Sequence, residues 1–302
     1  MNTSDKNYTA ALRLLPPEMR ERAALLPPER QSAAEELRLR VGHSPTVLLP
    51  GGEAPLGDVP VAPRDLDAVV EIATGASAHT SRDTVRAGYI NAPGGYRIGL
   101  CGAAITDGGE ISGFRALSSL AIRIPRARRG VADFLAVALG GKIPSTLLIS
   151  PPGAGKTTLL RELVRLCSDG SEKLAVPPSR VGLADERGEL AAASGGVPQM
   201  DVGRRTDVLS SCPKSQAVLM LLRAMNPQTV ALDEITAPED AEAIVRAANC
   251  GVRLFATAHA ASLDDLTSKP MYRKLLDAGI FRAAVTIVNV AGRREYEVTQ
   301  LP

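Results

Sequence analysis

The middle of this 302-residue chain reads Ser150-Pro151-Pro152-Gly153-Ala154-Gly155-Lys156-Thr157-Thr158. The apolar residues on either side predict a strand over Thr146–Ser150 and a helix over Lys156–Leu166. A glycine-rich turn between a strand and a helix is the setting of a phosphate-binding loop, because glycine lets the backbone wrap around phosphate and the helix N-terminus adds a positive field. We therefore predict that residues 152–158 bind nucleotide phosphates, with Lys156 at the β- and γ-phosphates and the Thr157 hydroxyl on Mg²⁺. The standard pattern has glycine at position 150, where this chain has serine.

A second apolar strand ends in two acidic residues, in the stretch Thr229-Val230-Ala231-Leu232-Asp233-Glu234. Ligands of open α/β sheets bind at the carboxyl ends of the strands. We predict that Asp233 holds Mg²⁺ and that Glu234 polarises the attacking water. An adjacent Asp-Glu pair also occurs on ordinary surface loops, and its place at the end of an apolar strand favours the site over that alternative.

Three further segments carry candidate site residues. His259 ends the apolar stretch that begins at Phe255, and there either Thr257 or His259 could sense the γ-phosphate, although a lone histidine is more often structural. Glu186 and Arg187 follow the predicted strand Val181–Ala184, where they could join the metal and water network or form a simple salt bridge. Arg204 and Arg205 lie in a loop-like segment, and either they are surface residues or one of them is an arginine finger that reaches a neighbouring subunit's γ-phosphate.

The pattern of expected strands and helices changes near residue 125. Short alternating strands and helices over residues 1–125 predict a small α+β domain. From residue 126 to 302, continuous apolar strands alternate with helices, which predicts a parallel α/β sheet. The basic segment Pro125–Gly130 is predicted to link the two domains, and Ala284–Val290 with Glu295–Leu301 to form a closing hairpin.

Composition narrows the possible functions. The charge is nearly balanced, with 35 basic and 33 acidic residues, so the chain as a whole has no polycationic field, although a local basic face stays open. The chain has no Trp, and aromatic stacking platforms for nucleic acid are not expected. The four cysteines form no C-x-x-C pair, and a zinc site is not expected. A polar N-terminus and the lack of any apolar run near 18 residues predict neither a signal peptide nor a membrane span.

Together, these motifs resemble the secretion-type ATPases of type II secretion, type IV secretion and pilus assembly. Those proteins carry a Walker A loop, an acidic "Asp box", a Walker B strand and a "His box" in this order, which here correspond to Ser150–Thr158, Asp185–Glu189, Val230–Glu234 and Thr257–His259. Within that class the chain is most similar to the family of the stage III sporulation AA proteins of spore-forming bacteria. The stretches that carry this similarity are Glu35–Gly42, Gly94–Leu100, Arg204–Leu209, Cys212-Pro213-Lys214, Asp233-Glu234-Ile235 and Glu239-Asp240-Ala241.

The resemblance implies an α/β fold in which a RecA-like P-loop ATPase domain follows a smaller α+β domain. It implies ATP and Mg²⁺ as ligands, assembly into a homo-oligomer, expected to be a hexameric ring, and no nucleic-acid partner. It also implies a mother-cell ATPase in the cytoplasm, peripheral to a membrane-embedded sporulation channel between mother cell and forespore, which it would energise. The chain departs from the family pattern at Ser150 and at Thr236, where glycine is expected. Two other functions stay open from the residues: a RecA-like nucleic-acid motor, and an ATP-binding scaffold or switch without significant hydrolysis.

Overall fold

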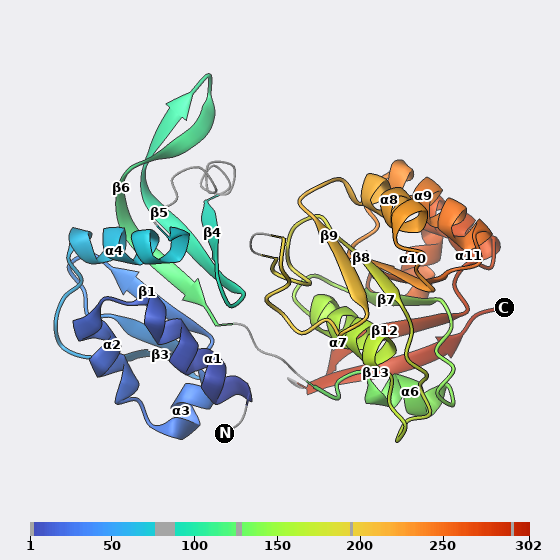
Figure 1. Cartoon of the computed structure of the whole chain (residues 1–302), viewed down its shortest axis with the longest axis horizontal. Coiled ribbons are helices and arrows are strands. Elements are labelled where there is room, and N and C mark those ends of the chain that lie inside the picture. Colours follow the sequence, from blue (N-terminus) through green and yellow to red (C-terminus); the bar gives the residue numbers. More distant parts are fainter. Residues whose placement is uncertain (1–2, 76–87, 125–128, 194–195, 291–292) are drawn as a thin grey trace. The chain divides into compact units, whose positions relative to one another are not determined.

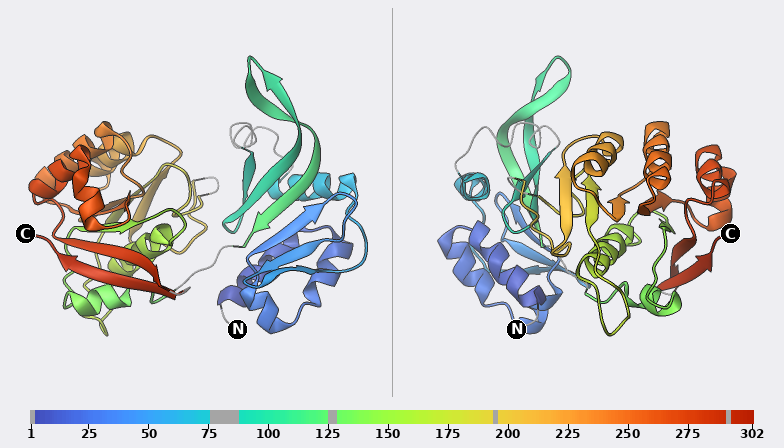
Figure 2. Two further views of the ribbon diagram at one scale, coloured as in Figure 1. Left: turned by 180° about the vertical axis from the view of Figure 1, so that it is seen from behind. Right: turned by 45° about the vertical axis from the view of Figure 1, so that its right-hand side comes forward.

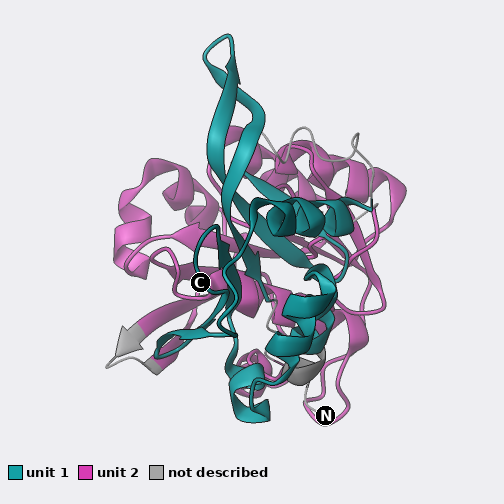
Figure 3. Cartoon of the chain, turned by 90° about the vertical axis from the view of Figure 1, so that its left-hand side faces the viewer, with its two compact units in different colours: residues 1–127 teal, residues 128–302 magenta. Residues whose placement is uncertain are grey.

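The structure, a computed structural model, describes residues 3–75, 88–124, 129–193, 196–290 and 293–302. The chain divides into two compact units, Met1–Ala127 (unit 1) and Arg128–Pro302 (unit 2), which Figures 1 and 3 show. Most of the expected linker, residues 125–128, and the turn of the expected closing hairpin, residues 291–292, lie outside the described residues. In the described ranges, no helix combines the length and the apolar character that crossing a membrane requires.

Unit 1 is built on a six-stranded antiparallel sheet in the order β3-β2-β1-β6-β5-β4. Its elements, in chain order, are α1 (Thr3–Ala11), the 3-10 helix η1 (Leu12–Leu14), α2 (Pro17–Ala24), α3 (Pro28–Ala33), β1 (Glu36–Arg40), β2 (Thr46–Leu49), β3 (Gly52–Pro55), α4 (Pro63–Thr74), β4 (Tyr89–Ala92), β5 (Tyr96–Asp107) and β6 (Glu110–Arg123). Proline opens α2, α3 and α4, because its fixed φ suits the first turn and its missing N–H has no partner to lose there.

The core of unit 1 lies between this sheet and its helices. Leu37 and Leu39 of β1 are buried on one face, and Leu66, Val69 and Ala73 form the buried stripe of α4. Strand β1 pairs with β6 only over Ser119–Arg123, so the hairpin of β5 and β6 continues beyond the rest of the sheet, as Figure 2 shows.

Unit 2 is built on a seven-stranded sheet in the order β13-β12-β7-β11-β10-β8-β9, parallel except for β13. Its elements are α6 (Asp133–Ala138), β7 (Thr146–Ser150), α7 (Lys156–Asp169), β8 (Val181–Asp185), β9 (Thr206–Ser210), α8 (Lys214–Ala224), β10 (Thr229–Leu232), α9 (Pro238–Asn249), β11 (Arg253–His259), α10 (Leu263–Ser268), α11 (Pro270–Asp277), β12 (Ala283–Val290) and β13 (Arg293–Gln300). The expected fold class, an α/β domain preceded by a smaller α+β domain, is confirmed.

The sheet of unit 2 is covered on both faces, which explains its continuous apolar strands. In β7, Leu148 packs in one core with α6 and α7, whereas Leu147 and Ile149 pack in a second core with α8, α9, α10 and α11. Successive strand residues point to opposite faces, so every residue of β7 must suit a buried position.

The parallel register brings the polar residues of the sequence analysis to one edge of this sheet. Ser150 at the end of β7 pairs with His259 at the end of β11, and Leu232 at the end of β10 pairs with both Ala256 and Ala184. The loops that follow these strands therefore leave from neighbouring positions.

Replacing Phe255 by Ala should destabilise unit 2. This ring is fully buried in β11, and removing such a side chain costs about 3–5 kcal/mol of unfolding free energy because a cavity remains. Denaturant unfolding, followed by hydrogen exchange in unit 2, measures the loss. Val137→Ala is the control, because Val137 is 71% exposed in α6 and its loss should change stability by no more than about 0.5 kcal/mol. Equal effects of the two substitutions would contradict the assignment of this core.

Candidate functional site

The glycine-rich loop forms a backbone cradle at the start of α7. Gly153 and Gly155 have φ values of 75° and 103°, a region that glycine enters without steric cost. Helix α7 begins at Lys156, and the first N–H groups of a helix have no partner within it. The cradle is therefore suited to an anion, as the sequence predicts.

Lys156 lies inside this loop with its ammonium group held by carbonyl oxygens. The side chain is buried, and its Nζ donates to the carbonyl oxygens of Ser150 at 2.8 Å and Pro151 at 3.1 Å. It also donates to Nδ1 of His259 at 2.9 Å. Burial lowers the pKa of Lys156, although the nearby carboxylates act in the opposite direction.

Ser150 fits its position although the standard loop has glycine there. Its φ is not positive, so the backbone does not require glycine. The side chain is fully buried; its hydroxyl donates to the Pro151 carbonyl at 2.9 Å and lies 3.2 Å from Nζ of Lys156. The serine therefore adds an oxygen that faces the lysine.

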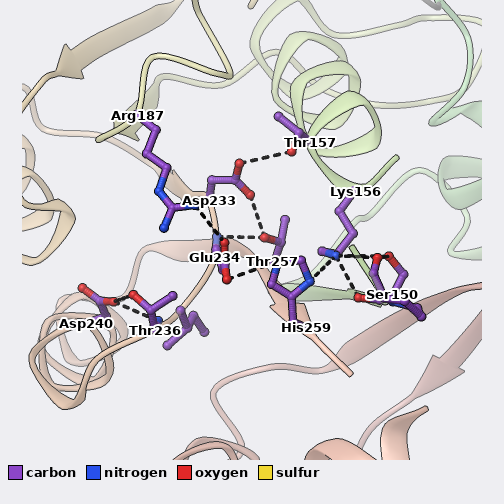
Figure 4. A network of polar contacts seen from close by, with 12 residues as sticks. Ser150, Lys156, Thr157, Arg187, Asp233, Glu234, Thr236, Asp240, Thr257 and His259 are labelled. Atoms are coloured by element: carbon purple, nitrogen blue, oxygen red, sulfur yellow. Dashed lines mark hydrogen bonds and ion pairs between the residues drawn. The ribbon is translucent and has the colours of Figure 1, made fainter. Parts of the chain in front are cut away.

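The hydroxyl of Thr257 holds the two acidic residues that follow β10. It donates to Oδ1 of Asp233 at 2.7 Å and accepts from the backbone N–H of Glu234 at 2.8 Å (Figure 4). The other carboxylate oxygen of Asp233, Oδ2, accepts from the Thr157 hydroxyl at 3.2 Å. Asp233 thus links the end of β10 to the first turn of α7, where a cation bound to phosphate would need its ligands.

Glu234 has a left-handed backbone, with φ of 40°. This conformation is rare outside glycine, and such strain occurs at functional sites where surrounding contacts hold it in place. Its carboxylate lies 3.1 Å from Nε2 of His259 and 3.4 Å from the Arg187 guanidinium. Glu234 therefore points to partners different from those of Asp233.

The contacts of His259 assign its proton. The ammonium of Lys156 can only donate, so Nδ1 of His259 is the acceptor. Nε2 then carries the proton and donates to Glu234. The imidazole connects the phosphate-loop lysine to the second acidic residue.

Glu186 is paired away from this network. Its carboxylate lies 2.8 Å from Nζ of Lys214, a buried lysine of α8 that also lies 3.6 Å from Asp240 and donates to the Thr236 hydroxyl at 3.3 Å. Asp240 in turn accepts from the backbone N–H of Thr236 at 3.0 Å. Lys214 therefore joins the segments after β8 and β10, and Thr236, at the position where the sequence analysis expects glycine, has polar partners.

Asp185, the residue before Glu186, has a structural role. Its buried carboxylate accepts from the backbone N–H groups of Leu190 at 3.1 Å and Ala191 at 2.8 Å. Arg161 of α7 donates to the carbonyl of Leu190 as well. Burial raises the pKa of Asp185, although these N–H groups favour its charged form. Together they shape the loop that carries Glu186 and Arg187.

Arg204 lies far from the loop. Its side chain is 82% exposed and contacts Asp169 at the C-terminal end of α7, with Nε and Oδ1 3.5 Å apart. The phosphate loop precedes the other end of this 14-residue helix. The structure thus brings together Lys156, Thr157, Asp233, Glu234, Arg187 and His259, and leaves Arg204 and Glu186 outside this network.

The sequence predicts that Thr257 or His259 senses the γ-phosphate, and the structure places the Thr257 hydroxyl between Asp233 and the backbone N–H of Glu234. Thr257 lies two residues before His259 in β11, so the two side chains point to the same face of the sheet. Lys214 is not predicted as a site residue, and it enters the sequence analysis only within the Cys-Pro-Lys stretch. Nothing local identifies Lys214, because its partners come from two other segments.

Two comparisons with known sequences point to one family. Residues 12–296 match the family model described as "Sporulation stage III, protein AA". The stage III sporulation protein AA of Bacillus subtilis (strain 168) is 34% identical over 280 residues, which cover 92% of this chain and 90% of that protein.

Solved structures share the fold. The pilus retraction motor PilT, crystallised with bound ADP, has a TM-score of 0.63 and 17% identity, over 94% of this chain and 82% of that one. The ATPase DotB of Legionella pneumophila has a TM-score of 0.57 and 14% identity, over 91% and 80%. At these identities the likeness concerns the fold alone, and it confirms the expected architecture.

Replacing Thr257 by Val should loosen both acidic residues. The substitution keeps the shape but leaves Asp233 and the N–H of Glu234 without the hydroxyl, which costs about 1–3 kcal/mol of unfolding free energy. The Mg²⁺ concentration needed for half-maximal nucleotide binding should also rise. Thermal unfolding and titration calorimetry measure these effects. Thr257→Ser, which keeps the hydroxyl, is the control; a Val variant with unchanged Mg²⁺ dependence would refute the role given to Thr257.

Proposed function

The chain belongs to the family of stage III sporulation protein AA, and on this basis we propose that it is a Mg²⁺-dependent motor that hydrolyses ATP to ADP and phosphate. The observation that carries the proposal is one polar network. In it the phosphate-loop lysine, the Thr157 hydroxyl and two strand-end carboxylates are joined through Thr257 and His259. A cluster of salt bridges with a purely structural role does not require a glycine-rich loop and a helix N-terminus beside it, whereas a nucleotide site does.

The phosphate loop binds the substrate in this proposal. The backbone N–H groups of residues 152–158 and the start of α7 surround the phosphates, and Lys156 turns from the Ser150 carbonyl toward the β- and γ-phosphate oxygens. The oxygen atoms of Thr157 and Asp233 fit Mg²⁺, which prefers hard oxygen ligands, keeps several waters and takes few ligands from the protein. When bound there, Mg²⁺ neutralises charge on the phosphates.

Glu234 orients the attacking water. Its carboxylate accepts a proton from that water as the oxygen bonds to the γ-phosphorus, and the bond to the bridging oxygen breaks with its electron pair leaving on ADP. His259 and Arg187 hold the carboxylate in position. The left-handed backbone of Glu234 fits a residue whose direction must differ from that of Asp233.

Arg204 is assigned to a neighbouring subunit's site. It lies at the opposite end of α7 from its own phosphate loop, so an arginine finger at this position acts in trans. This requires a homo-oligomer, and the family resemblance favours a hexameric ring. PilT, named as a pilus retraction motor, shows that this fold can serve mechanical work.

Family membership also supports the cellular role. We place the motor in the mother-cell cytoplasm, peripheral to the membrane-embedded channel that links mother cell and forespore, which it energises. Glu186 contributes through Lys214, by holding the segment that follows Glu234.

Glu234→Gln should abolish turnover while keeping Mg-ATP binding. The amide cannot accept the proton, and loss of a general base lowers the rate by about 100-fold or more. Steady-state phosphate release over a series of protein concentrations measures this. The wild-type rate per chain should rise with concentration, because an oligomer completes the site.

Two results would contradict the proposal that the chain is an ATP-hydrolysing motor. Tight Mg-ATP binding with no turnover at any concentration would favour the switch, and salt-dependent stimulation by DNA or RNA would favour the nucleic-acid motor. A Glu234→Gln variant with unchanged turnover would remove Glu234 from the mechanism.

Mixtures of inactive variants should show whether Arg204 and Arg187 act in their own chain or in a neighbouring subunit. Arg204→Ala alone should lower turnover by about 10³-fold with little change in ATP affinity. Mixing it with Lys156→Ala, which keeps Arg204 but has a defective phosphate loop, should restore part of the activity. In mixed oligomers, some sites combine the intact phosphate loop of an Arg204→Ala subunit with the intact Arg204 of a neighbouring Lys156→Ala subunit.

Arg187→Ala is the matched control. Arg187 contacts Glu234 of its own chain, so mixing Arg187→Ala with Lys156→Ala should restore nothing. If the mixture with Arg187→Ala regained ATPase activity, Arg187 would not act within its own chain. If the mixture with Arg204→Ala regained none, Arg204 would not act in a neighbouring subunit.

A further inference from the structure

The closing hairpin of unit 2 reaches the phosphate loop. Strand β12 pairs with β7 from Ala283 beside Thr146 to Thr286 beside Ile149, where β7 is about to end. β12 then continues to Val290, and the chain returns as β13. The hairpin therefore extends past the carboxyl edge of the sheet, beside the loop that follows β7.

Arg294, near the start of β13, lies against Gly155 of that loop. A Cβ built on Gly155 would stand 2.9 Å from Nη1 and 3.0 Å from Cζ of Arg294, and its three nearest neighbours all belong to that guanidinium. Gly155 precedes the loop lysine and has φ of 103°. The guanidinium thus covers the side of Gly155 on which every other amino acid would carry a side chain.

If the loop binds phosphate as proposed, the side of Gly155 without a Cβ borders the ligand. Glycine is used in such loops because the backbone must come close to phosphate, and a Cβ would stand in the way. A guanidinium on this border presents paired N–H donors that match phosphate oxygens. Arg294 is exposed, and among the residues that the structure describes no carboxylate forms an ion pair with it, so its donors are available.

Lys156 and Arg294 reach the loop from different sides. Lys156 contacts His259 of β11, whereas Arg294 comes from the hairpin of β12 and β13, and β11 and β12 flank β7 on opposite sides. We propose that Arg294 is a second cationic ligand of the nucleotide, which binds α- and β-phosphate oxygens of the same chain's ATP or ADP. This inference rests on the proposed function of the phosphate loop.

The test compares full-length variants by titration calorimetry with two probes, Mg-ADP and inorganic pyrophosphate. Arg294→Ala should weaken both by about tenfold, the value of one hydrogen bond to a charged group. Arg294→Lys should recover part of the loss, since it keeps the charge without the paired donors. Arg282→Ala is the matched control, because Arg282 is an exposed arginine beside the other end of β12 and should leave both affinities unchanged.

The outcomes separate the two proposals. If the wild-type chain binds neither probe, the nucleotide site and the role of Arg294 both fail. If the wild type binds and Arg294→Ala binds equally well, only Arg294 is refuted. A variant that loses Mg-ADP but keeps pyrophosphate would also refute it, because the arginine would then contact the base or ribose.

Discussion

The site depends on one hydroxyl, that of Thr257, which binds two consecutive acidic residues in different ways. It donates to the carboxylate of Asp233 and accepts from the backbone of Glu234. The parallel pairing of β10 and β11, with Leu232 beside Ala256, places Thr257 next to both. Because the backbone at Glu234 is left-handed, its side chain departs from the direction of Asp233. One carboxylate thus faces the first turn of α7, and the other faces His259 and Arg187.

The fold of unit 2 was predictable because its strands are short apolar runs that end in polar residues. The strand Thr146–Ser150 has the expected bounds, since both faces of the sheet are buried and every residue had to be apolar or small. Strand β9 was not predicted, because an edge strand is only partly buried and its sequence, Thr206–Ser210, lacks such a run. Lys156, Asp233 and His259 could be placed from strand ends alone. The pairing of Glu186 with Lys214 could not, because it joins segments whose contact follows from tertiary packing.

The charges of the network are balanced within a small volume. Lys156 is buried among carbonyl oxygens, which lowers its pKa, and the carboxylates of Asp233 and Glu234 favour its charged form. A buried charge is costly unless it is paired and hydrogen-bonded. Phosphate oxygens can replace the Ser150 carbonyl as acceptors for the same ammonium without leaving it unpaired. In our proposal the lysine therefore has two alternative sets of partners, and exchange between them would link the binding of phosphate to the position of His259 and, through it, of Glu234.

The length of helix α7 separates Arg204 from the phosphate loop of its own chain. Its 14 residues span about 20 Å at 1.5 Å per residue, with the phosphate loop at one end and the pair of Asp169 and Arg204 at the other. An arginine side chain is far shorter than this helix, so Arg204 cannot reach the phosphates of its own chain. Arg187 and Arg294 lie beside the loop and the acidic residues of the same chain. In our proposal the three arginines therefore divide by position: two complete the site from within, and the third has a use in catalysis only when a second copy of the chain brings it there.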